Sequence, residues 1–156
     1  MTLYLSMAAF ALASSISPGP VNLVALGAGA QHGLRASLRH VSGATLGFTV
    51  LLLLTGLGLA ELMAGWPELL GAIRWGGIAF LFWLAWMLAA DKGELAFDTG
   101  AGGPSLLSGA AMQWLNPKAW LAAVSGMGAF VADGDGTLVW RFAAIYFVVC
   151  WLSILC

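Results

Sequence analysis

Two apolar stretches of this chain are each interrupted by proline near the middle, and this pair of interruptions restricts the possible folds more than any other feature. Ser17-Pro18-Gly19-Pro20 interrupts the first stretch, and Asn116-Pro117-Lys118 interrupts another 99 residues later. Proline lacks an amide hydrogen and clashes with the preceding turn, so a helix ends or kinks there. In hydrocarbon, such breaks are tolerated where they face protein or line a cavity. The pair therefore predicts a helical membrane protein with a cavity at the breaks.

The rest of the sequence supports a membrane fold. Hydrophobic residues make up 61% of the 156 residues and charged residues 8%, whereas about 25% of a soluble domain is charged. A membrane-crossing helix needs about 20 mostly apolar residues, so about five can fit. The expected spans are residues 1–30, 41–63, 73–90, 106–130 and 138–156. We therefore predict an all-α multipass membrane protein with five transmembrane helices.

The polar stretches between these spans give an orientation. Residues 31–40 contain Arg35 and Arg39 and are predicted to be a loop, and residues 91–104 are predicted to be a flexible, glycine-rich connector. Positive charge favours the cytoplasmic side, which places both loops there and the N-terminus outside. No basic residue precedes Arg35, so a cleaved signal peptide is not expected. The net charge of −1 makes nucleic acid an unexpected partner.

The two breaks also predict an internal repeat. Pro18 lies in the first expected span and Pro117 in the fourth, at corresponding places in successive three-helix units. A unit with an odd number of helices inverts when it is repeated, and inverted repeats with broken helices are a recurrent design of alternating-access transporters. The predicted division is a first repeat, 1–90, a connecting loop, 91–104, and a second repeat, 105–156. Doubling the spacing gives about 198 residues, so the second repeat is expected to lack its third helix.

At the first break, the candidate substrate-binding residues are Ser17, Pro18, Gly19, Pro20 and Asn22. The two prolines free backbone carbonyls, which then need partners such as nearby serine hydroxyls, the Asn22 amide, water or a substrate ammonium group. The alternative is a proline kink that neighbouring helices satisfy completely.

At the second break, the candidates are Gln113, Asn116, Pro117 and Lys118. A lysine at the centre of a span costs about 2.5 to 3.5 kcal/mol, so it should face a cavity and pair with a carboxylate or a carbonyl. Gln113 lies one turn before Pro117 and can add a polar contact. The alternative is that Lys118 extends to a membrane interface and only anchors the helix.

Other motifs are less specific. Gly43 and Gly47 form a GxxxG pattern, which permits close helix packing within the chain or, alternatively, between two chains. His32 and His40 are interpreted as loop or interface residues. The sequence contains no metal-ligand cluster, phosphate loop or nucleophile–base pattern, so neither a cofactor nor enzymatic activity is expected.

Three segments together resemble the LysE-type translocator family, which includes the lysine exporters and the homoserine/threonine resistance proteins. The segments are Ser17-Pro18-Gly19-Pro20, Gly33-Leu34-Arg35-Ala36-Ser37-Leu38 and Gln113-Trp114-Leu115-Asn116-Pro117-Lys118-Ala119-Trp120. The resemblance implies an exporter of amino acids or related metabolites in the bacterial inner membrane, with six helices in two repeats and the proton gradient as driving force. It also implies that residues 18–20, Asn22 and residues 116–118 line the translocation path.

One other function remains open from the sequence, and a further one lacks the residues that it would need. The chain could be a truncated, non-transporting membrane fragment or a helix-packing partner, because the sixth helix of the family is not found. A homodimer could supply the missing surface. A membrane-embedded redox carrier would need a cysteine pair near the breaks, whereas Cys150 and Cys156 both lie in the last expected span.

Overall fold

The computed structural model describes residues 1–59, 104–131 and 135–155, together with the single residues 68, 75, 79, 82 and 86. All regular structure in this described part is helical. The helices are α1 (Thr2–Ile16), α2 (Pro20–His32), α3 (Leu34–Leu54), the short π-helical segment η1 (Thr55–Leu59), α6 (Leu106–Leu115), α7 (Pro117–Phe130) and α8 (Gly136–Leu155). Apart from isolated residues, the expected third span, 73–90, and the connector, 91–104, lie outside it.

The first expected span, 1–30, is two helices that meet at a bend of 62°. α1 ends at Ile16, and Pro20 is the first residue of α2. Proline suits this first position because its missing amide hydrogen would have no partner there in any case. Residues 17–19 form the first break, with Gly19 in an extended conformation.

The second expected span begins earlier than predicted, and the loop predicted for residues 31–40 is wrong. Only Gly33 separates α2 from α3, and its φ of 80° is a conformation that glycine adopts readily. Arg35 and Arg39 are exposed, whereas His40 is buried on the opposite side. The charged residues that suggested a loop therefore form the exposed face of a helix whose other face is packed.

The number of membrane spans is not confirmed. Within the described residues, two helices are long and apolar enough to cross a membrane, Leu34–Gly58 and Gly136–Leu155, and the bent α1–α2 pair would be a third. The expected fourth span, 106–130, is divided at Asn116 into helices of 10 and 14 residues. We call Asn116 the second break.

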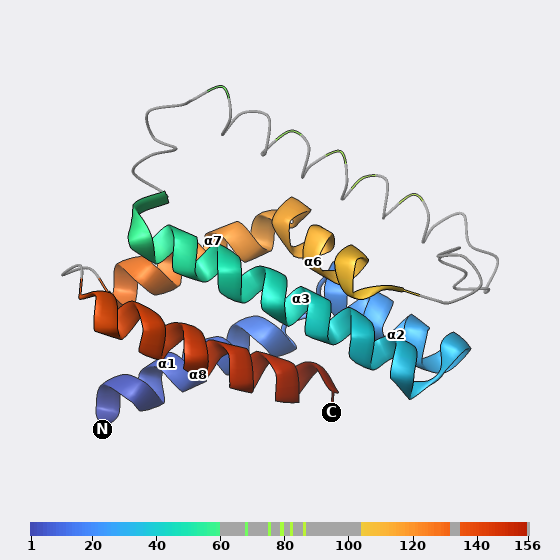
Figure 1. The fold of residues 1–156 in the computed structure, drawn as a ribbon, viewed down its shortest axis with the longest axis horizontal. Helices are drawn as coiled ribbons and strands as arrows, with labels where there is room; N and C mark the ends of the chain where they lie inside the picture. The colour runs from blue at the N-terminus through green and yellow to red at the C-terminus, as the bar shows by residue number, and fades with distance from the viewer. Residues whose placement is uncertain are drawn as a thin grey trace.

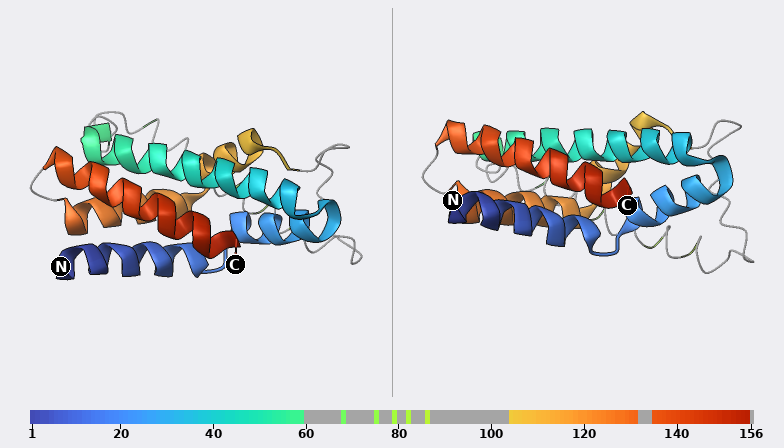
Figure 2. Two further views of the ribbon diagram at one scale, coloured as in Figure 1. Left: turned by 60° about the horizontal axis from the view of Figure 1, so that its bottom comes forward. Right: turned by 90° about the horizontal axis from the view of Figure 1, so that it is seen from below.

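α3 lies at the centre of the arrangement and packs against α2, α6 and α8, while α1 packs mainly along α8. The α1–α2 pair and the α6–α7 pair run in opposite directions along the long axis of the molecule (Figures 1 and 2). The N-terminus, the end of α7 and the start of α8 lie at one end of the molecule, which we call the N-terminal end.

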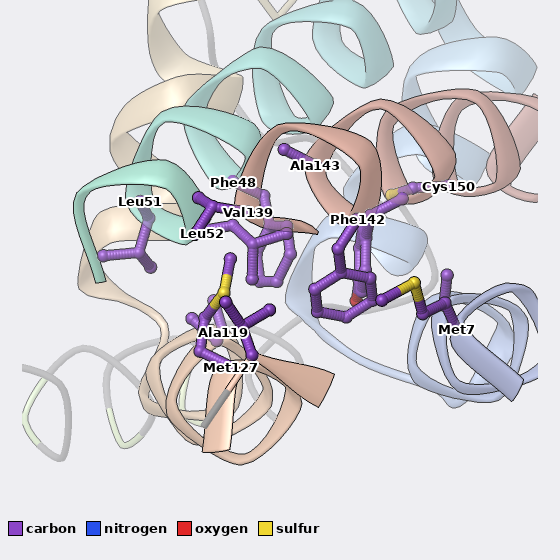
Figure 3. Close-up of a cluster of buried hydrophobic side chains, with 14 residues drawn as sticks. Met7, Phe48, Leu51, Leu52, Ala119, Met127, Val139, Phe142, Ala143 and Cys150 are labelled. Carbon is purple, nitrogen blue, oxygen red and sulfur yellow. The ribbon is translucent and has the colours of Figure 1, made fainter. Parts of the chain in front are cut away.

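One hydrophobic core joins helices from the beginning and the end of the chain (Figure 3). Its largest fully buried side chains are Phe48 of α3 and Phe142 of α8. The Phe142 ring contacts Phe130 of α7, with ring centroids 5.2 Å apart, and Tyr146, at 6.0 Å. Phe10 of α1 completes this aromatic group through Phe130, at 5.7 Å.

α3 and α6 are in backbone contact along a line of small residues. A Cβ atom added at Gly43 would overlap the backbone of Leu106, and one added at Gly109 would overlap the carbonyl of His40. At Gly47 an added Cβ would lie 2.8 Å from the Cα of Ala110. The GxxxG pattern therefore serves packing within the chain, where it allows two helices to approach unusually closely.

Candidate functional site

The two breaks meet in space, although 101 residues separate the groups that touch. The Lys118 Nζ donates a hydrogen bond of 2.6 Å to the backbone carbonyl of Ser17. Gly19 faces the same ammonium group, because a Cβ atom added there would lie 3.5 Å from Nζ. The lysine is therefore directed to the first break, not to a membrane interface as in the anchoring alternative.

The carbonyl groups freed at the first break have partners within the chain. The Ser17 hydroxyl donates to the carbonyl of Ser14 at 3.0 Å. The side-chain amide of Asn22 donates to the carbonyls of Ser15, at 2.9 Å, and of Ser17, at 3.4 Å. The Ser17 carbonyl thus accepts hydrogen bonds from both Asn22 and Lys118. The first break is therefore not helical, but its carbonyl groups have hydrogen-bond donors.

The second break is organised as a compact helix start. The Asn116 Oδ1 accepts a hydrogen bond from the backbone N–H of Lys118 at 3.1 Å, which is the usual contact of a helix N-cap. Pro117 occupies the first position of α7. The Trp120 indole donates to the carbonyl of Trp114 at 2.8 Å and so ties the two helices together across the break. This arrangement fixes the backbone position from which the Lys118 side chain extends.

A cavity of about 40 Å³ lies between the two breaks, and we call it the central cavity. A buried water needs about 10 to 15 Å³ of such space, so the cavity has room for a few waters but not for an amino acid. Its lining comes from every described α-helix: Ser14, Ser15, Gly19, Val21, Asn22, Phe48, Gln113, Asn116, Lys118, Ala119, Ala122, Tyr146, Cys150 and Ile154. A wider groove of about 540 Å³ adjoins it and shares Asn22 and Ile154 with it.

The charge in the central cavity is unbalanced. Of the described residues that line it, only Lys118 is charged. Within the described part of the chain the acidic residues are Glu68 and Asp135, and both are exposed. The polar groups that remain to stabilise the ammonium are neutral carbonyl, amide and hydroxyl groups, so the cavity is suited to an anionic group.

The structure brings most of the predicted site residues together. Gly19, Asn22, Gln113, Asn116 and Lys118 line the central cavity, and Ser17 contributes its carbonyl. The three prolines, Pro18, Pro20 and Pro117, are not among the lining residues, and their role is to set the course of the backbone.

Sequence reasoning missed the contribution of α3 and α8. Tyr146 and Cys150 lie one turn apart on α8 and face the central cavity together with Phe48 of α3. The Cys150 thiol also receives a contact of 3.9 Å from the Thr45 hydroxyl. A tyrosine and a cysteine at this spacing in a mostly apolar span were the signal that the sequence offered.

His40 departs from its interpretation as a loop or interface residue. Its side chain is fully buried, and within the described residues neither ring nitrogen has a hydrogen-bond partner. It does not line the central cavity. Its burial follows from the helical conformation of residues 34–40, which turns this position towards α6.

Comparison with known proteins supports the resemblance seen in the motifs. The model of the LysE type translocator family matches residues 12–156. The chain belongs to the LysE type translocator family. Two similar relatives of this LysE chain are the cysteine/O-acetylserine efflux proteins of Salmonella typhimurium (strain LT2), 32% identical over 136 residues, and Escherichia coli (strain K12), 31% identical over 133. Each match covers 84% of this chain and 67% of the relative.

Membership of the LysE type translocator family makes this chain a membrane translocator, which indicates a transporter and not an enzyme. No solved structure matches it. The two breaks and the central cavity fall within the residues that the family model covers.

Proposed function

We propose that this LysE chain exports amino acids or similar small zwitterions across the bacterial cytoplasmic membrane, with the central cavity as the substrate site. The observation that carries the proposal is the contact between Lys118 and the Ser17 carbonyl, which joins the two breaks at one point. Broken helices that meet in this way present backbone groups to a substrate in many secondary transporters.

The chemistry of the central cavity favours a substrate that carries both charges. Lys118 is a cation with no acidic neighbour among the described lining residues, so it can bind a substrate carboxylate. The carbonyls of Ser15 and Ser17 are acceptors at the end of a helix, where the backbone dipole favours a positive group such as a substrate ammonium. A partner for the carboxylate and a partner for the ammonium of a zwitterion thus lie at the same small cavity.

Alternating access between two inverted repeats is the proposed mechanism, with the proton gradient as energy source. The opposite directions of the α1–α2 and α6–α7 pairs support this mechanism, because an inverted repeat requires such a reversal. In this arrangement residues 1–90 form one repeat and residues 105–156 belong to the other. The central cavity is too small for an amino acid in the present conformation, so the repeats must move apart for a substrate to enter.

The substrate class is proposed from the relatives and from the size of the cavity. The relatives are named for the efflux of cysteine and O-acetylserine, and both compounds are small zwitterions. A central cavity of about 40 Å³ would need the least enlargement for a substrate of this size. We therefore expect cysteine and O-acetylserine to be exported in preference to large amino acids.

Export of labelled compounds from whole cells tests the proposal. Cells that express this chain should release labelled L-cysteine and O-acetyl-L-serine faster than control cells, and a Lys118→Ala variant should not. Variant Trp114→Phe is the control, because it removes a 3.1 Å hydrogen bond from the indole to the Gly47 carbonyl outside the central cavity. If the wild-type chain inserts normally but no amino acid is released, the alternative of a non-transporting packing partner is favoured.

A further inference from the structure

The ammonium group of Lys118 lies where the proposed function would place the ammonium group of a substrate. Its Nζ is 2.6 Å from the Ser17 carbonyl oxygen, which is a short distance typical of a charge-assisted hydrogen bond. The lysine side chain ends in the same chemical group that an amino acid carries, a primary ammonium on a saturated carbon. The same acceptor cannot serve both groups fully at one time, since Asn22 already donates to it.

We propose that Lys118 is an internal substitute for the substrate ammonium, which holds the two breaks together in the empty protein and is exchanged when a zwitterion binds. The substrate ammonium takes the Ser17 carbonyl, and the released Lys118 ammonium pairs with the substrate carboxylate. This inference rests on the proposed function and adds to it the order of events at the site and the reason for its selectivity.

Exchange makes both charges of the substrate necessary. An amine without a carboxylate would release the Lys118 ammonium into a cavity whose described lining holds no acidic side chain, and an unpaired buried charge is costly. A carboxylate without an ammonium would draw Lys118 away and leave the Ser17 carbonyl without its charged donor, so that only the longer 3.4 Å hydrogen bond from Asn22 would remain. Only a zwitterion restores a partner to every charged group.

The contact also joins two distant parts of the chain at the site. Ser17 belongs to the break between α1 and α2, whereas Lys118 lies in the first turn of α7, so this hydrogen bond joins one broken pair to the other at the breaks. When the substrate takes over the carbonyl, this direct link is replaced by a link through the substrate. Substrate binding therefore replaces the direct link between the two breaks with a link through the substrate, in addition to occupying the cavity.

The Lys118→Met variant distinguishes the proposed exchange from a purely structural role of the lysine. We expect Lys118→Met to weaken binding of L-cysteine by about tenfold or more, because the carboxylate loses a charged hydrogen-bond partner. The same variant should bind cysteamine, the decarboxylated analogue, about tenfold more tightly than the wild type, because the competing ammonium is gone. The wild type should bind cysteamine and 3-mercaptopropionate, which lacks the ammonium, far more weakly than it binds L-cysteine.

The measurement is equilibrium dialysis of the purified chain with each radiolabelled compound under reducing conditions, with gel filtration to verify folding. Gly27→Ala on α2, where an added Cβ meets nothing within 4 Å, is the control and should bind the three compounds with the same affinities as the wild type. Loss of both L-cysteine and cysteamine binding in a folded Lys118→Met would overturn the exchange while leaving the proposed function in place. If the wild type binds no amino acid, both fail. Wild-type affinity for cysteamine equal to that for L-cysteine would also refute the exchange.

Discussion

Lys118 and Gly19 face each other across the central cavity, and the absence of a side chain at Gly19 gives the ammonium its room. The backbone at Gly19 is extended, with a φ of −163°, so any residue could adopt it. Glycine is therefore not needed at this position for its conformation, and what it provides is space beside the Lys118 ammonium. A substitution here changes the cavity without straining the break.

We predict that Gly19→Ala folds normally but binds L-cysteine at least about tenfold more weakly. The added Cβ would lie 3.5 Å from the Lys118 Nζ, which is an ordinary contact in the empty protein, but it would occupy the space that a substrate ammonium needs. Equilibrium dialysis gives the affinity, and the melting temperature in detergent reports folding. Gly27→Ala on α2, where an added Cβ meets nothing within 4 Å, is the control and should bind as the wild type does. Equal affinity of Gly19→Ala and wild type would contradict the prediction.

Asn22 supports the first break in a different way, by satisfying two carbonyl groups at once. We predict that Asn22→Ala lowers the free energy of unfolding by about 1 to 3 kcal/mol, because the carbonyl of Ser15 loses its donor and that of Ser17 keeps only Lys118. Thermal unfolding in detergent measures this. Ser6→Ala, which removes an exposed hydroxyl contact to the Thr2 carbonyl, should have almost no effect. A loss no greater than that of Ser6→Ala would show that water replaces the amide.

At the scale of elements, both breaks use the same device, a proline that begins a new helix at its first position. This device could be predicted from the sequence, because Pro20 and Pro117 cannot continue a helix and Asn116 is a favourable N-cap. The bounds of α3 could not be predicted in the same way. Arg35 and Arg39 are as compatible with a loop as with the exposed face of a helix, and only tertiary packing of the opposite face decides between them.

The site could be predicted only in part for a similar reason. The polar residues at the breaks have unusual chemistry for a membrane segment, so they were identifiable from the sequence. Phe48 and Ile154 line the central cavity as well. The direction in which an apolar side chain points cannot be predicted from the sequence when the whole helix is apolar. Their contribution follows from how α3 and α8 pack, which the sequence pattern alone does not determine.

The contact between α3 and α6 should tolerate no added atom. We predict that Gly109→Ala destabilises the protein by about 1 to 3 kcal/mol or more, because the new methyl group would overlap the backbone carbonyl of His40 and one of the two helices must move. Thermal unfolding in detergent measures the change. Gly128→Ala on α7 is the matched control, because an added Cβ there meets nothing within 4 Å. Similar melting temperatures for the two variants would show that the helices are not in contact.

At the scale of the whole molecule, one core is shared by helices from both ends of the chain. Met7 of α1, Leu51 of α3, Met127 of α7 and Phe142 of α8 all belong to it. Its packed aromatic and aliphatic side chains come from α1, α3, α7 and α8 (Figure 3). In the proposed alternating access, a path past these residues requires their side chains to separate.

Cys150 offers a way to observe such a movement, because its buried thiol lines the central cavity. In a Cys156→Ser background it is the only thiol, since the sequence contains two cysteines. We predict slow labelling of Cys150 by a maleimide in membranes, further slowed by O-acetyl-L-serine, which would occupy the cavity. Phe142→Ala should speed the labelling, because it opens the aromatic group. Labelling that is fast and unaffected by either change would mean that the thiol is not enclosed.

The backbone contact between α3 and α6 has a consequence for any motion of the two halves. Gly43, Gly47 and Gly109 leave no side chain between the two helices that could slide or change rotamer. Small residues at these positions let the two helix backbones pack closely, and separating the helices would lose this packing. In the proposed alternating access we therefore expect the contact between α3 and α6 to persist while the contact between the two breaks opens and closes.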